Sequence, residues 1–199
     1  MELSSFRPIN TFINAASLDG RQAICVIKDP AITEVDEPTF AKLIDSDFKN
    51  GVIKVTVLSR LLENAPDFAR GFIGVAFRID ESNSKFEGLY IRPTNGRADD
   101  QLRRNRSTQY FSYPDFKFDR LRNESAGIYE SYADMGLDEW INLKIEVQGE
   151  KAKLYLNECS QPVLVVNDLK HGAGYSGSIG LWVDVGTEGF FTDLRIENK

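Results

Sequence analysis

The sequence predicts an all-β fold, a sandwich or barrel of antiparallel strands. Apolar residues recur at every second position along most of the chain, which is the spacing of one face of a strand. Turn residues separate these stretches at short intervals, and no long window carries the stripe of an amphipathic helix. No internal repeat, linker or low-complexity segment interrupts the pattern, so we expect a single domain over residues 1–199.

In the first half of the chain, alternation predicts strands at residues 10–28, 38–43, 52–57, 71–79 and 86–92. One face of the last two strands is apolar and carries Ile73, Val75, Phe77, Leu89 and Ile91. The opposite face carries Arg78, Tyr90 and Arg92, so we expect these three side chains together on one exposed sheet face. Pro93 ends the second of these strands because proline has no N–H to give to the ladder.

In the second half, the same pattern predicts strands at residues 108–113, 140–147, 151–157, 162–166, 178–185 and 191–196. The strands on either side of Gly149 read as a hairpin across residues 148–150. Residues 137–139 form at most one helical turn.

The net charge of −6 is unevenly distributed along the chain. Between Arg60 and Arg122, ten Arg and two Lys stand against nine acids, a balance of +3, so the remainder carries −9. Arginines and aromatic rings together suit a planar or polyhydroxylated partner, although arginines in loops are also commonly solvated. The acidic total argues against nucleic acid as a partner.

No apolar run approaches the roughly 20 residues that a membrane span requires. Residues 1–8 lack the basic and apolar regions of a signal peptide, so we expect a cytoplasmic protein, or a secreted one if a leader was trimmed. Cys25 and Cys159, with His171 as the single histidine, cannot form a Cys/His zinc cluster. We expect two free thiols, with one disulfide as the less favoured alternative.

Several segments resemble, in order, the strands of concanavalin A-like lectin/glucanase jelly rolls. Residues 48–55 resemble the entry strand F-x-N-G-x-I-x-V, and residues 74–93 the laminin-G-like pattern G-x-x-F-R … Y-E-x-x-Y-x-R-P. Residues 140–170 are similar to W-x-x-x-K-x-x-V, x-V-Y-x-N and P-V-L-x-V-x-D-L, and residues 178–194 to G-x-I-G-L-W … F-x-D-L. The resemblance covers residues 40–197 and is nearest to the laminin-G-like group that includes the 3-keto-disaccharide hydrolase domains.

This resemblance implies a jelly roll of two antiparallel sheets, with ligand bound on a concave face. The candidate ligand-binding residues on that face are Arg78, Glu87, Tyr90, Arg92, Asn95, Gln109, Tyr113 and Trp182. Amides can bond sugar hydroxyls and aromatic rings can stack on the C–H face of a sugar, although Trp182 is equally well read as a core residue. Glu87 lies on the same strand face as core residues. Because an unpaired buried carboxylate is costly, it must pair with an arginine or lie at the mouth of the strand.

Motifs for catalysis are weak. The related endoglucanases carry E-x-D-x-x-E or E-x-D-x-E on one strand, and the only approximation here, residues 34–38, reads as a solvated loop before a proline. Other acids are scattered, at Glu87, Asp99, Asp100 and Asp184. The sequence has no G-x-S-x-G nucleophile elbow with which His171 could form a catalytic site. It also lacks phosphate-binding and dinucleotide-binding loops. No cofactor is expected; a Ca²⁺ ion on Asp184 or Asp193 is left open.

The function that this sequence favours is non-catalytic carbohydrate binding. The first alternative is a glycoside hydrolase of the 3-keto-disaccharide hydrolase type, and the second is a protein-interaction module. Arg103, Arg104 and Arg106 repel one another, so we expect Asp99 and Asp100 to offset part of their charge. The remaining positive potential favours an acidic sugar such as a uronate, because a guanidinium fork matches a carboxylate. The sequence leaves the oligomeric state and any catalytic residues open.

Overall fold

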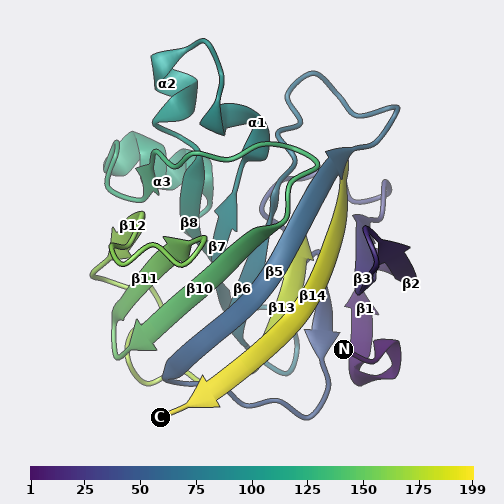
Figure 1. Ribbon diagram of the computed structural model, residues 1–199. Coiled ribbons are helices and arrows are strands. Elements are labelled where there is room, and N and C mark those ends of the chain that lie inside the picture. Colours follow the sequence, from purple (N-terminus) through teal and green to yellow (C-terminus); the bar gives the residue numbers. More distant parts are fainter.

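Two antiparallel sheets of seven strands pack face to face in the computed structural model, which describes residues 1–199 (Figure 1). Sheet A has the order β1 (Phe6–Ile9), β4 (Phe40–Leu43), β13 (Ser178–Val183), β6 (Ile73–Ile79), β7 (Phe86–Ile91), β8 (Thr108–Tyr113) and β9 (Glu130–Ser131). Sheet B has the order β12 (Leu164–Val166), β11 (Lys151–Leu156), β10 (Ile141–Gln148), β5 (Gly51–Leu61), β14 (Thr187–Asn198), β3 (Arg21–Lys28) and β2 (Thr11–Leu18). This sandwich confirms the predicted fold class.

The helices are short and all lie outside the sheets. The 3₁₀ turn η1 (Leu3–Ser5) precedes β1, and α1 (Pro93–Gly96) and α2 (Gln101–Arg104) fill the β7–β8 connection. The third helix, α3 (Phe118–Glu124), follows β8. None of these helices has the length and apolar character needed to cross a bilayer.

The main core lies between the sheets and follows the predicted alternation. Val55 on β5 stands opposite Leu143 on β10, and both side chains are buried in this core. Phe77 on β6 is fully buried and meets the ring of Phe48 edge to face, with 6.4 Å between centroids. Burying such large apolar side chains between two sheets is the main stabilising contribution in a sandwich.

The outer face of sheet A is covered by its own aromatic rings. A second buried cluster on this face comprises Phe40, Ala76, Ile79, Phe86, Tyr90, Phe111 and Trp182. The ring of Phe111 lies over Gly88, where a Cβ would stand 2.1 Å from it. Gly180 similarly makes room for Phe40. The small residues on this face therefore accommodate rings of the protein itself rather than an approaching ligand.

The connection between β3 and β4, residues 29–39, packs against this face. The indole N–H of Trp182 donates to the carbonyl of Glu37 at 2.9 Å, and the Tyr113 hydroxyl donates to the Glu37 carboxylate at 3.1 Å. The backbone N–H of Phe118 donates to the Asp36 carboxylate at 2.7 Å. The expectation of a solvated loop at residues 34–38 is therefore wrong, because distant residues in β8, α3 and β13 bind this segment.

Arg78 departs from the predicted alternation. It has a left-handed φ of 55° next to an irregularity in the β6–β13 pairing, and its fully buried side chain turns away from the outer face. Its guanidinium donates to the carbonyls of Lys49 (3.0 and 2.8 Å), Gly149 (2.8 Å) and Gly172 (2.9 Å). Ile79 takes its place in the outer aromatic cluster. The prediction that Arg78 shares an exposed face with the other two residues is wrong.

Candidate functional site

A pocket of about 240 Å³, which we call the arginine pocket, lies at the end of sheet A near α1, α2 and α3. Residues from six separate parts of the chain line it: Val35, Asp36, Phe68, Arg70, Phe72, Tyr90, Arg92, Asn95, Arg103, Arg106, Phe118, Arg122 and Asp184. Five of these residues are arginines and four carry aromatic rings. The pocket thus combines dense positive charge with apolar rings.

Arg92 forms the buried floor of this pocket. It follows β7 directly, and Pro93 starts α1 behind it. Its guanidinium donates to the Tyr90 hydroxyl at 2.9 Å, to the Gln109 side-chain carbonyl at 3.0 Å and to the Arg106 carbonyl at 3.0 Å. Because Arg92 is only 4% exposed and these bonds hold it, its charge is fixed in place.

Asn95 connects this floor to α2. Its side-chain N–H donates to the Arg106 carbonyl at 3.0 Å, and its side-chain oxygen accepts from Nε of Arg103 at 3.3 Å. A second donor of Arg103 reaches the hydroxyl of Thr94 at 3.5 Å. Arg103 is thus oriented by neutral acceptors only.

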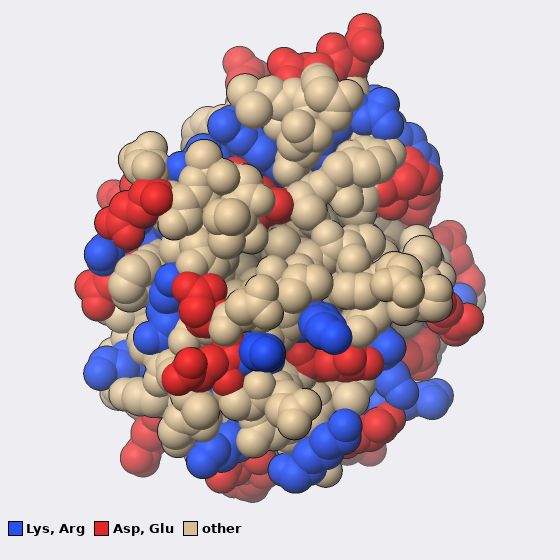
Figure 2. All heavy atoms as spheres, turned by 90° about the vertical axis from the view of Figure 1, so that its left-hand side faces the viewer, with Lys and Arg blue, Asp and Glu red and all other residues tan.

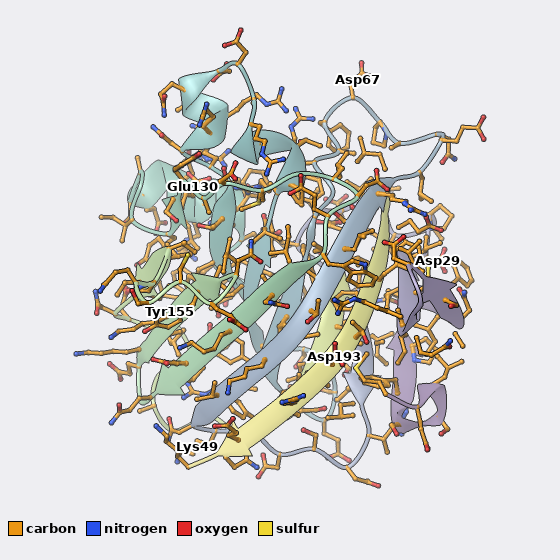
Figure 3. The ribbon with its side chains drawn as sticks, viewed as in Figure 1. Asp29, Lys49, Asp67, Glu130, Tyr155 and Asp193 are labelled. Carbon is orange, nitrogen blue, oxygen red and sulfur yellow. The ribbon has the colours of Figure 1, made fainter.

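A single buried carboxylate, that of Glu130 on β9, is the ionic partner of three of the arginines. Its oxygens lie 3.4 Å from Arg92 and 3.8 Å from Arg106, and it accepts two-pronged hydrogen bonds from Arg122. Figure 3 shows Glu130 beside α3 in the upper left of the view. One negative charge cannot neutralise three guanidinium groups, so the pocket keeps a positive potential.

Arg70 and Arg103 have no carboxylate within ion-pair distance. Arg70 instead donates to the backbone carbonyls of Asp67 (2.6 Å) and Ala69 (2.7 Å). Burial lowers the pKa of the Arg70 guanidinium, and the charges of Arg103 and Arg92 lower it further. These two half-buried arginines therefore line the pocket without a carboxylate partner.

Two carboxylates lie at the opposite wall. The Asp184 side chain accepts from the buried Lys28 ammonium at 2.6 Å and from the Asp36 backbone N–H at 2.9 Å. Burial and the adjacent Asp184 charge raise the pKa of the Asp36 carboxyl to about 7. Asp193 lies on β14 in the other sheet, away from this wall. The Asp36 carboxyl at this wall can hold a proton near neutral pH.

Four predicted residues come together here: Tyr90, Arg92, Asn95 and Gln109 are all buried beneath or beside the arginine pocket. Tyr90 and Arg92 share the outer face as expected, but they are 1% and 4% exposed rather than open to solvent. Gln109 touches the pocket only through Arg92, and its amide N–H donates to the Tyr110 carbonyl at 2.6 Å.

The other four predicted residues lie elsewhere. Arg78 binds backbone carbonyls in the interior, and the Trp182 ring is covered by Tyr90, with 4.7 Å between centroids. Tyr113 stacks on Phe86 at 5.1 Å.

Glu87 is fully buried, and its carboxylate accepts from the Tyr110 hydroxyl at 2.6 Å and from the His171 backbone N–H at 2.9 Å. Of the two expected alternatives, an arginine partner or a position at a strand mouth, the first is not found: neutral donors satisfy this carboxylate, which lies at the second residue of β7.

The acids beside the predicted arginine loop form no ion pair with its arginines. Asp100 caps α2 by accepting the Arg103 backbone N–H at 2.9 Å, and Asp99 is exposed without a partner. Arg97 pairs instead with Asp134 and Glu139, which follow β9. We expected Asp99 and Asp100 to offset part of the charge of Arg103, Arg104 and Arg106; neither acid forms an ion pair with them, because the Asp100 carboxylate caps the N-terminus of α2 and Asp99 is exposed.

Sequence reasoning missed several lining residues: Asp36, Phe68, Arg70, Phe72, Phe118 and Arg122. The one available signal was the concentration of arginine and aromatic residues between Arg60 and Arg122. That signal predicted a cluster but could not place Asp36, which enters from the distant β3–β4 connection.

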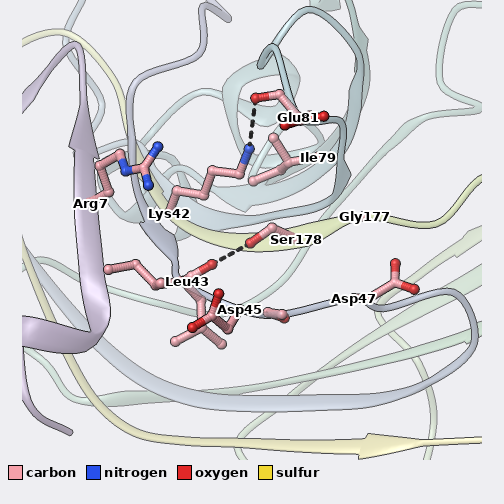
Figure 4. A pocket seen from close by; sticks show the side chains of 11 residues that line it. Arg7, Lys42, Leu43, Asp45, Asp47, Ile79, Glu81, Gly177 and Ser178 are labelled. Carbon is pink, nitrogen blue, oxygen red and sulfur yellow. Dashed lines mark hydrogen bonds between the residues drawn. The ribbon is translucent and has the colours of Figure 1, made fainter.

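Other surfaces offer weaker sites. A larger hollow of about 510 Å³ lies between β1, β4 and β13, but its Lys42 already donates to the carbonyls of Asp80 and Glu81 (Figure 4). On the face turned toward the viewer in Figure 2, acidic and basic side chains are interspersed, so no field of one sign develops there.

Comparisons with known proteins show the fold alone. No family model matches the chain, and no curated protein matches its sequence. Among solved structures, it is similar to the carbohydrate-binding module CBM66 from Bacillus subtilis, with a TM-score of 0.57 and 12% identity over 96% of this chain and 98% of that one.

Two further structures have comparable similarity. A candidate glycosyl hydrolase from Parabacteroides distasonis has a TM-score of 0.57 and 10% identity over 98% and 89% of the two chains. A Bacillus subtilis protein of unknown function with a galectin-like fold has a TM-score of 0.52 and 13% identity over 98% and 90%. All three share the β-sandwich architecture described above.

Proposed function

We propose that this protein binds a carbohydrate non-catalytically in the arginine pocket, and that the favoured ligand carries a carboxylate. The observation that carries the proposal is the pair Arg70 and Arg103, which line the pocket without a carboxylate partner. A guanidinium presents a planar fork of donors that a sugar carboxylate can accept at two points. The similarity to a carbohydrate-binding module supports the class of ligand.

The rest of the pocket suits a sugar ring. Phe68 is 54% exposed at the pocket wall, and Phe72 and Phe118 are half-buried beside it. These rings offer an apolar surface to the C–H face of a sugar, while the arginines hold its anionic group. A volume of about 240 Å³ limits the part of the ligand that enters to a small group.

Isothermal titration with matched neutral and uronic-acid oligosaccharides tests this proposal. We expect the uronate to bind more tightly, with an advantage that shrinks at high salt. Arg103→Gln should weaken uronate binding by about tenfold or more, because a charge-assisted hydrogen bond is lost. Arg104→Gln is the matched control, since Arg104 is the next residue of α2 and bonds the Tyr132 hydroxyl instead. Equal affinities for both sugars, independent of salt, would exclude the proposal.

Glycoside hydrolysis is the second candidate, and one observation favours it. Asp36 and Asp184 both line the pocket, and the pKa of Asp36 near 7 suits a proton donor. Incubation with uronic-acid oligosaccharides, followed by product analysis, separates hydrolysis from binding. Product that disappears in Asp36→Asn would favour the enzyme, whereas intact ligand recovered from a tight complex would favour binding.

A further inference from the structure

The outer face of sheet B carries a row of like charges on three adjacent strands. Lys144 on β10 stands directly opposite Lys54 on β5, and Lys54 stands directly opposite Arg195 on β14. Successive strands are about 4.8 Å apart, so the three cations span about 10 Å. We call Lys144, Lys54 and Arg195 the basic row.

This arrangement does not help the fold. Like charges placed directly opposite each other destabilise a pair of strands. The stabilising contacts of these strands lie on their other face, where Val55, Leu143 and Ile145 are buried in the core. Lys144 and Lys54 have exposed partners in Glu146 at 3.0 Å and Glu197 at 2.9 Å, which contribute little in water.

Arg195 is exposed and makes no ion pair or side-chain hydrogen bond. Arg195 is thus the one member of the basic row without a carboxylate partner.

The basic row lies in a groove of about 590 Å³ that crosses the strands. Four cations and two acids line this groove, and one of those acids, Asp193, lies 3.6 Å from Arg21. In Figure 3, Tyr155 and Asp193 mark its two sides on the face of sheet B turned toward the viewer. The groove is independent of the arginine pocket, which lies on sheet A.

Neutral polar groups stand next to the cations. The Thr56 hydroxyl donates to the Asn142 side-chain oxygen at 2.8 Å, which leaves the exposed Asn142 amide N–H groups for a ligand. The Lys144 ammonium lies 3.9 Å from the centre of the Tyr155 ring and covers it. Hydroxyl and amide groups suit sugar hydroxyls, whereas stacking of nucleotide bases needs open aromatic rings, which this groove lacks.

We propose that this groove is a second binding site, which takes a linear anionic polysaccharide across strands β10, β5 and β14. Acidic groups of the polymer meet the basic row, and its hydroxyls meet the exposed amide of Asn142, which Thr56 holds in place. An open groove across several strands admits an internal segment of a chain.

Binding of a heparin-derived octasaccharide, measured by isothermal titration at low and high salt, tests the second site. The double variant Lys54→Gln/Arg195→Gln should bind at least about tenfold more weakly and with a shallower salt dependence. The control Lys49→Gln/Lys151→Gln removes the same charge from exposed positions outside the groove and should bind as the wild type does. Both substituted side chains of the test variant lie at the surface, and a thermal melt verifies its fold.

Three outcomes would overturn this inference. Unchanged affinity in Lys54→Gln/Arg195→Gln would show that the groove does not bind the polymer. An equal loss in the control variant would show attraction to charge in general, and equally tight binding of an oligothymidine would show a general polyanion surface. Arg103→Gln separates the two proposals, because it should leave octasaccharide binding intact while weakening uronate binding in the arginine pocket.

Discussion

At the scale of single residues, Asp36 should make stability depend on pH. Its folded-state pKa of about 7 exceeds the ordinary value of 3.8, so the native state holds a proton that the unfolded state releases. The native state therefore binds more protons between about pH 4 and pH 7, and stability falls as pH rises through that window. At about 1.4 kcal/mol per pKa unit, the fall is on the order of 2–4 kcal/mol.

Asp36→Asn provides the measurement. Asparagine keeps an acceptor for the Phe118 N–H but does not ionise, so the difference in unfolding free energy between variant and wild type should grow from pH 4 to pH 8. Urea unfolding at a series of pH values gives this difference. Parallel curves for the two proteins would show that Asp36 does not titrate in this range.

At the scale of elements, Arg78 connects the irregular end of β6 to three loops. Its guanidinium donates to the carbonyls of Lys49, Gly149 and Gly172. Burial lowers the pKa of this guanidinium, and the nearby Glu87 charge acts in the opposite direction. Arg78→Ala would leave these buried acceptors without a donor. We expect a loss of about 3–5 kcal/mol of unfolding free energy, as when one partner of a buried charged network is removed.

Arg78→Lys is the informative comparison, because it keeps the charge but cannot reach three separate carbonyls with the same geometry. In denaturant melts it should recover only part of the loss. A cost below about 1 kcal/mol for the alanine variant would show that water replaces the guanidinium at little expense.

At the scale of the whole molecule, the core between the sheets should dominate stability. Phe77→Ala removes a fully buried ring and should cost roughly 3–5 kcal/mol. Phe12→Ala on β2 is the control, since Phe12 is 58% exposed and its loss should cost less than about 0.5 kcal/mol. Similar chemical melts for the two variants would mean that the core face is wrongly assigned.

The whole fold also shows which features the sequence could predict and which it could not. Period-two alternation identified the strands and the core face most directly on β10, which buries every second residue, whereas β6 and β7 are buried on both faces. It could not predict that Arg78 turns inward, since a local irregularity reverses the parity of the residues beyond it. Nor could it place Asp36, whose position depends on contacts with residues more than 80 positions away.

The position of β14 has a consequence for synthesis of the chain. This strand comes last in the sequence but lies between β5 and β3, so it occupies the middle of sheet B. While residues 187–198 are still inside the ribosome, the nascent chain exposes unpaired edges on both β3 and β5. Sheet B therefore cannot be completed until residues 187–198 have emerged, and until then the facing edges of β3 and β5 are open to pairing with other chains.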